Sequence, residues 1–340
     1  MPHKTALIVT TIAKPNLALK KLAQECLKRD IHFIVIGDES SPADFRIEGC
    51  DFYNIDRQME LDFDFACQCP TNHYARKNIG YLIAISEKAE IIIETDDDNF
   101  PTQDFWQDRS LSQNTKIIES IGWVNPYHYF TDNFIWPRGL ALDEIRKPLP
   151  NYDQFPERRI DCPIQQGLVQ ENPDVDSLFR LLFELPFSFE KKRRLAMQRG
   201  TWCPFNSQNT TWFQTVFALM YLPAFCSFRM TDIWRSFIAQ RILWDNNWGL
   251  LFHEATMTQK RNVHDLMHDF EDEVPGYLKN KKLCRILQDL SLPPGKEYLL
   301  SNLLACYEQL EIHNIIKPEE VILLKYWIED FKRITKSNYV

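Results

Sequence analysis

The chain has 340 residues, of which 44% are hydrophobic and 25% are charged, and its formal net charge is −8. This composition is typical of a globular protein with a sizeable core. The negative charge argues against nucleic acid as a partner, because phosphate backbones are bound by clustered Lys and Arg. Nine cysteines, an odd number scattered mostly as singles, indicate reduced thiols of a cytoplasmic protein rather than a disulfide framework.

The first residues do not have the pattern of a secretory signal peptide. The short apolar run near the start soon meets Lys14 and Pro15, whereas a signal peptide needs a longer apolar stretch. No run approaches the ~20 apolar residues of a transmembrane helix. We therefore expect a cytoplasmic protein without a membrane span.

The first hundred residues alternate between strand and helix patterns. Residues 6–9 and 33–36 are short apolar strands, and a helix that opens near residue 16 lies between them. A second helix is predicted over residues 74–88, followed by a strand over residues 90–94. Such β-α-β units form parallel sheets with helices on both faces, and ligands bind outside the carboxyl ends of their strands.

The remainder of the chain divides into an irregular part and a helical part. Residues 120–260 are rich in Pro, Trp and Asn, and long irregular insertions in a compact domain are usually functional. The last seventy or so residues have apolar positions at helical spacing. We predict an α/β catalytic domain over residues 1–270 and a helical extension over residues 271–340.

An acidic run, Asp96-Asp97-Asp98, follows the strand predicted at residues 90–94. Adjacent carboxylates repel and raise one another's pKa, and a divalent cation relieves this repulsion. In extended backbone, alternate side chains share a face, so Asp96 and Asp98 can converge on one hard cation while Asp97 points elsewhere. The alternative is a solvated acidic turn.

Two basic residues, Arg76 and Lys77, open the helix that precedes the acidic strand. Positive side chains normally disfavour the N-terminus of a helix, so this pair indicates an anion shared with the helix dipole. A nucleoside diphosphate would fit. The alternative is a pair of solvated basic residues.

Seven short motifs in order resemble the STELLO glycosyltransferase domain over most of residues 5–265. They are Arg-Lys-Asn-Ile-Gly-Tyr at 76–81, Glu-Thr-Asp-Asp-Asp-Asn at 94–99, Trp-Pro-Arg-Gly at 136–139, Gln-Gln-Gly-Leu at 165–168, Pro-Asp-Val-Asp at 173–176, Pro-Phe-Asn-Ser-Gln-Asn-Thr at 204–210 and Thr-Asp-Ile-Trp-Arg at 231–235. The resemblance implies a GT-A-like fold, a Rossmann-type mixed sheet flanked by helices. It also implies a DXD-type acidic motif that binds Mn²⁺ or Mg²⁺ carrying the diphosphate of a sugar nucleotide.

The resemblance assigns roles by position in this sequence. It implies Asp96 and Asp98 as metal ligands, Arg76 and Lys77 as phosphate contacts, and Thr10 or Thr11 together with Asp38 as contacts for base and ribose. Asp38 could otherwise be a helix N-cap or a turn residue.

Histidines late in the chain are further candidate ligands. Many GT-A enzymes use a late His on the metal, and His253 is the best-placed residue, although a buried, hydrogen-bonded His is the alternative. His264 and His268 have a spacing that can bind zinc, but a solvated helix face explains them more simply.

On the acceptor side, Asp232 is the candidate general base. It lies at the predicted start of a helix, and an inverting transfer needs one carboxylate to take the acceptor hydroxyl proton. A plain N-cap is the alternative. Arg235 and Arg229 could pair with Asp232 or meet the departing diphosphate. Four further residues could form stacking surfaces for carbohydrate rings: Trp136, Arg138, Trp202 and Trp234.

The resemblance, together with the acidic run and Asp232, implies a glycosyltransferase, with inversion preferred. It would move a sugar from a nucleoside-diphosphate sugar to a carbohydrate or glycoconjugate hydroxyl, in polysaccharide or glycoconjugate assembly, where assembly proteins are possible partners. One alternative is a nucleotidyltransferase, which would normally carry a Gly-rich loop after the first strand, whereas residues 10–15 contain no Gly. The other is a non-catalytic sugar-nucleotide-binding scaffold.

Overall fold

The computed structural model describes residues 4–260 and 265–336, which are built around an 11-stranded mixed sheet. One half of the sheet is parallel, in the order β3-β2-β1-β4. Its strands are β1 (Thr5–Thr10), β2 (His32–Ile36), β3 (Asp51–Tyr53) and β4 (Ile91–Thr95). This half confirms the parallel β-α-β arrangement that the sequence predicts.

Most strands of the other half of the sheet come from residues 120–260, which looked irregular in the sequence, while β5 and β6 precede that segment. This half continues from β4 in the order β12-β9-β13-β10-β6-β8, with mixed parallel and antiparallel pairing, and β5 pairs with β13. The strands are β5 (Asn99–Pro101), β6 (Ser112–Ile118), β8 (Glu157–Asp161), β9 (Ile164–Gln170), β10 (Arg194–Met197), β12 (Asn209–Phe213) and β13 (Leu250–Gln259). A separate pair consists of β7 (Gly122–Trp123) and β11 (Thr201–Trp202).

Helices cover both faces of the parallel half because side chains alternate along each strand. Leu7 and Val9 pack with α1 (Leu17–Lys28), whereas Ile8 packs with α4 (Lys77–Ser86) on the opposite face. Gly80 allows α4 to approach β1 closely, since a Cβ atom there would lie 2.7 Å from Cγ2 of Ile8.

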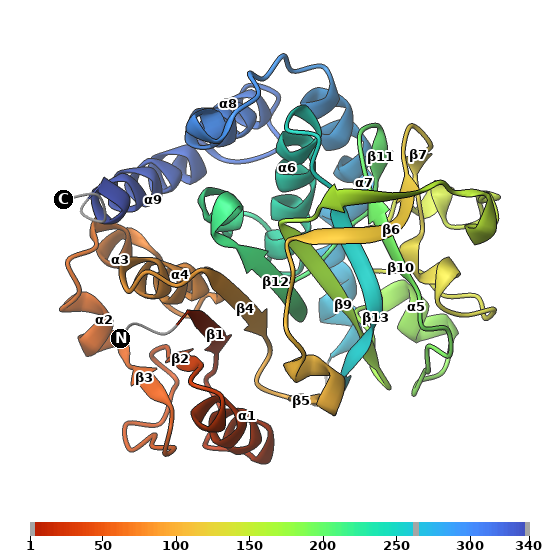
Figure 1. Ribbon diagram of the computed structural model, residues 1–340. Coiled ribbons are helices and arrows are strands. Elements are labelled where there is room, and N and C mark those ends of the chain that lie inside the picture. The colour runs from red at the N-terminus through yellow and green to blue at the C-terminus, as the bar shows by residue number, and fades with distance from the viewer. Residues whose placement is uncertain (1–3, 261–264, 337–340) are drawn as a thin grey trace.

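The remaining helices lie mostly beside the second half of the sheet and at one end of the parallel half (Figure 1). The α-helices are α2 (Ile55–Met59), α3 (Asp64–Gln68), α5 (Ser177–Leu182), α6 (Thr231–Asp245), α7 (Leu266–Gln288), α8 (Leu299–Ile312) and α9 (Pro318–Lys336). The 3₁₀ helices are η1 (Tyr74–Arg76), η2 (Gln103–Trp106), η3 (Pro126–Tyr129), η4 (Leu142–Glu144), η5 (Tyr152–Gln154), η6 (Gln214–Met220), η7 (Phe228–Met230) and η8 (Lys296–Tyr298). No helix of the described residues is long and apolar enough to cross a membrane.

The C-terminal helices are tied to the core by buried carboxylates. Glu320 of α9 accepts hydrogen bonds from the backbone N–H groups of Ala224 and Phe225 and from the hydroxyl of Tyr221. Asp330 accepts from the N–H of Phe65 at 2.8 Å and so caps α3. The predicted helical character of the C-terminal part is confirmed, while the division at residue 270 stays a prediction.

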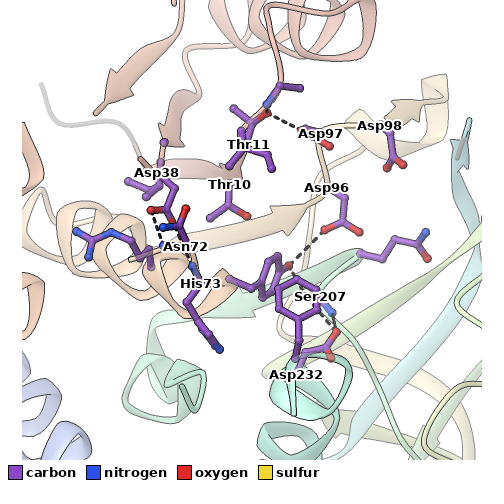
Figure 2. A pocket seen from close by; sticks show the side chains of 18 of the residues that line it. Thr10, Thr11, Asp38, Asn72, His73, Asp96, Asp97, Asp98, Ser207 and Asp232 are labelled. Carbon is purple, nitrogen blue, oxygen red and sulfur yellow. Dashed lines mark hydrogen bonds between the residues drawn. The ribbon is translucent and has the colours of Figure 1, made fainter. Parts of the chain in front are cut away.

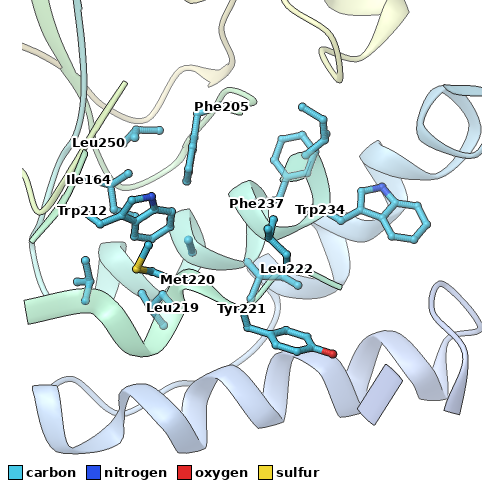
Figure 3. Packing of buried hydrophobic residues seen from close by; sticks show 14 of the residues in the cluster. Ile164, Phe205, Trp212, Leu219, Met220, Tyr221, Leu222, Trp234, Phe237 and Leu250 are labelled. Carbon is cyan, nitrogen blue, oxygen red and sulfur yellow. The ribbon is translucent and has the colours of Figure 1, made fainter. Parts of the chain in front are cut away.

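The largest apolar cluster lies between the sheet and the helices that follow β12. Figure 3 shows Trp212 of β12 next to Ile164 and Met220, with Phe237 of α6 farther along the same cluster. The indole Nε1 of Trp212 donates to Glu94 at 2.7 Å, so this ring is both packed and hydrogen-bonded. The expected fold class, an α/β mixed sheet flanked by helices with C-terminal helices, is confirmed.

Candidate active site

A cavity of about 520 Å³ opens at one edge of the sheet. The carboxyl ends of β1, β2, β4 and β13 meet there. β12 runs antiparallel to both β4 and β9, and β13 runs parallel to β9, so β13 points in the same direction as β4. The start of α6 closes another side. Of the residues that the sequence proposed, nine line the cavity: Thr10, Thr11, Asp38, Arg76, Asp96, Asp98, Arg138, Arg229 and Asp232.

The three carboxylates of the acidic run face different neighbours (Figure 2). Asp97 accepts from Oγ1 of Thr11 at 2.5 Å, and Asp98 accepts from Nε2 of Gln259 at 3.0 Å. Asp96 accepts from the hydroxyl of Tyr74 at 3.3 Å. Burial raises the pKa of Asp96 to about 7, the charges of Asp98 and Asp97 add to the rise, and the nearby ammonium of Lys77 opposes it. Asp96 therefore stands among like charges, with the Lys77 ammonium nearby.

The chemistry of this edge fits a hard divalent cation. Carboxylate and amide oxygens are the ligands that such ions prefer, and Oε1 of Gln259 is buried beside Asp98 without a hydrogen-bond partner in the described structure. Within residues 4–260 and 265–336, no group of three or more His, Cys, Asp or Glu side chains is placed to hold a metal ion. Mg²⁺ is commonly bound by one or two carboxylates with substrate phosphates and water as the other ligands, and Asp96 with Asp98 would suit that mode.

Lys77 and Arg76 point to different surroundings although they are adjacent. Nζ of Lys77 is fully buried, donates to the carbonyl of Thr95 at 2.9 Å, and lies 3.9 Å from Asp96. Arg76 donates instead to Gln58 and to the carbonyl of Cys69, at 2.8 and 2.9 Å. Lys77 is thus the member of the pair that faces the acidic run.

Asp232 is held by a buried arginine. Both carboxylate oxygens of Asp232 accept from Arg138 at 3.0 Å, and the same guanidinium donates to both oxygens of Asp174 at 2.8 Å. Burial alone would raise the pKa of Asp232, but Arg138, by charge and hydrogen bonding, lowers it to about 2. Asp232 is therefore ionised at neutral pH and firmly oriented.

The hydroxyl groups of Tyr74 and Ser207 lie in polar contact between the acidic run and Asp232. The hydroxyl of Tyr74 lies 3.3 Å from Asp96 and 2.6 Å from Oγ of Ser207. Oγ of Ser207 in turn donates to Asp232 at 3.2 Å, and the backbone N–H of Ser207 does the same. Figure 2 shows Asp96 and Asp232 facing the same space with Ser207 beside Asp232. These contacts fix the two carboxylates relative to each other.

Asp38 and the threonines at the end of β1 also line the cavity. The carboxylate of Asp38 accepts from the backbone N–H groups of Asn72 and His73, at 2.7 and 3.0 Å. It therefore fastens the loop before η1, a turn role that the sequence left open. Thr11 holds Asp97, as described above, and Thr10 also faces the cavity.

Three proposed residues do not line this cavity: Lys77, which lies buried beneath the acidic run, and Arg235 and His253, which lie farther away. Arg235 is 1% exposed and its guanidinium pairs with Glu94 at 2.7 Å on the buried side of α6. His253 lines a separate, small pocket and lies six residues before Gln259 in β13, roughly 20 Å along a strand. Burial lowers the pKa of His253 to about 4. We therefore assign neither Arg235 nor His253 to the site; His264 lies outside the described residues.

The proposed stacking surfaces also need correction. Trp136, Trp202 and Trp234 are all at most 3% exposed and belong to the apolar core. Arg138 does line the cavity, but it binds two carboxylates there. Each indole N–H has a hydrogen-bond partner: Asp176 for Trp136, Gln288 for Trp202 and Asn280 for Trp234.

Several residues of the site were missed by the sequence reasoning. Tyr74, Asp174, Ser207 and Gln259 line the cavity and bind its charged groups. Asp174 and Ser207 fall inside motifs that carry the family resemblance, and this was the signal that could have found them. Tyr74 and Gln259 carry no such signal.

One family model and two named proteins are similar to this chain. Residues 229–338 match the family model described as STELLO glycosyltransferases. The chain is 26% identical over 303 residues to the protein named Probable glycosyltransferase STELLO2 of Arabidopsis thaliana, and 29% identical over 261 residues to the one named Probable glycosyltransferase STELLO1 of the same plant. The resemblance to the STELLO family is confirmed. This family is one of glycosyltransferases by its description.

The STELLO relatives are much longer than this chain. The two alignments cover 83% and 70% of this chain but only 39% and 33% of STELLO2 and STELLO1. Among solved structures, one titled "Crystal Structure of a Mycobacterial Protein" is similar with a TM-score of 0.38 and 9% identity, over 82% of this chain and 74% of that one.

Proposed function

We propose that the chain is a metal-dependent glycosyltransferase that moves a sugar from a nucleoside-diphosphate sugar to a hydroxyl acceptor. The observation that carries this proposal is the shared cavity of Asp96, Asp98 and Asp232, with an acidic strand end on one wall and an oriented carboxylate on the other. The STELLO resemblance supports the reaction class. Polysaccharide or glycoconjugate assembly is the setting that we propose.

The donor would be held at the acidic run. Asp96 and Asp98 would bind Mn²⁺ or Mg²⁺, which supplies charge neutralisation for a leaving diphosphate. Nζ of Lys77, fixed 3.9 Å from Asp96, lies beneath the same site; burial lowers the pKa of Lys77 and the charge of Asp96 opposes this. Thr10 and Thr11 at the end of β1 provide hydroxyl groups on the side where base and ribose would lie.

The acceptor would be activated by Asp232 in an inverting transfer. A carboxylate that is already ionised can accept the hydroxyl proton as the new glycosidic bond forms. Arg138 and Ser207 hold Asp232 in one orientation, so the carboxylate is fixed before the acceptor arrives. Asp232 serves as the proton acceptor and Arg138 as its positioning residue.

The pairing of Asp232 with Arg138 is also the observation that favours the second candidate, a sugar-nucleotide-binding scaffold. A carboxylate whose pKa lies near 2 is a weaker base than one whose pKa lies near neutrality. A scaffold would keep the donor site and use Asp232 only to hold Arg138. Such a protein would bind the donor without transferring its sugar.

The test is a screen of nucleoside-diphosphate sugars for Mn²⁺-dependent thermal stabilisation and for hydrolysis of the donor. We expect at least one donor to stabilise the protein, and Asp96→Ala and Asp98→Ala to abolish that effect when binding is titrated by calorimetry with Mn²⁺ present. Both variants should fold about as stably as the parent, because the removed carboxylates repel their neighbours. Unchanged nucleotide affinity in both variants would refute the metal assignment.

A further inference from the structure

The cavity presents one large apolar ring to solvent. Phe228 lines the cavity wall and is 52% exposed, whereas a Phe side chain is normally buried. Its neighbours are His73 and Tyr74, whose ring centroids lie 6.2 and 6.0 Å from that of Phe228, each at 71° to its plane. Both contacts are steeply tilted, so they hold the Phe228 ring in place while neither neighbouring ring stacks parallel to it.

Phe228 stands one helical turn before Asp232. The 3₁₀ helix η7 leads directly into α6, and the junction residues Met230 and Thr231 both have right-handed helical backbone. The side chains of Phe228 and Asp232 line the same cavity, four residues apart in the chain. A group that stacks on Phe228 would therefore lie in the same cavity as the carboxylate that we propose as the general base.

The rest of the wall decides which kind of molecule could stack there. Among the described lining residues, the apolar side chains are those of Ile12, Ala13, Ile36 and Phe228, and charged, amide and hydroxyl groups make up most of the remainder. A lipid chain needs a continuous apolar wall, which this cavity does not offer. A sugar ring needs one apolar surface for its C–H face and polar groups for its hydroxyls.

Polar groups next to Phe228 meet that second requirement. Nδ1 of His73 accepts from the N–H of Ala75, so the neutral ring carries its proton on Nε2 and acts as a donor. Burial lowers the pKa of His73, which keeps the ring neutral. Arg229 also lines the cavity and is oriented by Glu273 at 2.9 Å.

We propose that Phe228 is the stacking platform for the acceptor, and that the acceptor is therefore a carbohydrate whose ring lies against Phe228 with a hydroxyl near Asp232. This inference rests on the proposed transferase function and names its acceptor class. The nucleobase of the donor is the other ring that could stack on Phe228. The test distinguishes a stacked nucleobase from a stacked sugar ring.

The experiment compares Phe228→Ala, the conservative Phe228→Trp, and Phe134→Ala as a matched control. Phe134 is 40% exposed and packs against Phe183 on another part of the surface. Binding of neutral glucose-, xylose- and mannose-based pentasaccharides is measured by saturation-transfer NMR and titration, and binding of UDP and GDP with Mn²⁺ by calorimetry.

We expect at least one pentasaccharide to bind the parent protein, about tenfold weaker binding in Phe228→Ala, and near-parent binding in Phe228→Trp and Phe134→Ala. Nucleotide affinity should not change. The proposal is overturned if no pentasaccharide binds, if Phe228→Ala binds it like the parent, or if that variant loses nucleotide affinity instead. Failure of the proposed function is distinct, because it would appear as absent nucleotide binding and donor hydrolysis in the parent protein.

Discussion

Replacing Asp232 by Asn tests whether this carboxylate is the general base of the proposed reaction. The change removes one of two carboxylates from Arg138, while the Asn oxygen can still accept one hydrogen bond and Asp174 keeps both of its own. The loss of folding stability should therefore resemble that of one hydrogen bond to a charged group, about 1.5–3 kcal/mol. Sugar transfer should fall about 10²-fold or more, because an amide cannot take the acceptor proton.

Asp174→Asn is the matched control for this variant, since Asp174 binds the same guanidinium with similar geometry. Asp174→Asn should lose a similar amount of folding stability in urea unfolding. Its rate of sugar transfer should fall by at most a few-fold. The assay measures donor affinity with Mn²⁺ by calorimetry and sugar transfer in single turnover for the parent and both variants. Donor affinity should stay nearly constant in all three proteins.

Equal loss of transfer in the two variants would show that Asp232 acts only by holding Arg138. Full transfer in Asp232→Asn would remove it as the base and favour a retaining reaction, which needs no such residue. Donor binding without transfer in the parent protein would favour the scaffold.

Other perturbations test the donor wall and the fold. In calorimetry, Lys77→Met should weaken binding of a nucleoside diphosphate by about 1.5–3 kcal/mol more than binding of its parent nucleoside. Arg76→Met should weaken binding of both ligands alike, because the Arg76 guanidinium is held away from Asp96. The opposite result would exchange the roles of the two residues. Burial lowers the pKa of His32, but Asp51 and Glu87 outweigh it and raise the pKa to about 9. Protonated His32 should therefore contribute on the order of 2 kcal/mol to the free energy of unfolding below about pH 6.5, and this contribution is lost as the pH rises through about 9. The free energy of urea unfolding should decline over this pH range in the parent protein but not in His32→Gln.

The parallel half of the fold was predictable because its signals are local. Short apolar runs such as residues 6–9 and 33–36, separated by helical spacing, identify buried strands and their crossovers from neighbouring residues alone. The strands of the second half were not predicted. Most of β9 and β12 is buried on both faces and is rich in Gln, Asn and Thr, so neither alternation nor an apolar run marks them as strands.

Those polar strands are stable only in their tertiary setting. Gln166 of β9 donates to the carbonyl of Asn209 and accepts from the N–H of Asn206, and Asn209 donates to Oγ1 of Thr256. Buried amides must be paired in this way, or their burial is unfavourable. Because every partner is distant in sequence, no local pattern could reveal the arrangement.

The sequence by itself determined which charged groups stand at strand ends, because a strand's carboxyl end can be recognised from the residues that precede it. It thereby placed Asp38, Asp96 and Asp98 at the functional edge. Only the tertiary structure decided which distant side chains meet them. It brought Asp232 to the cavity through Arg138 and turned Arg235 into the core against Glu94. The two arginines differ by their neighbours in space, and a charge acts according to the charges and solvent around it rather than its place in the chain.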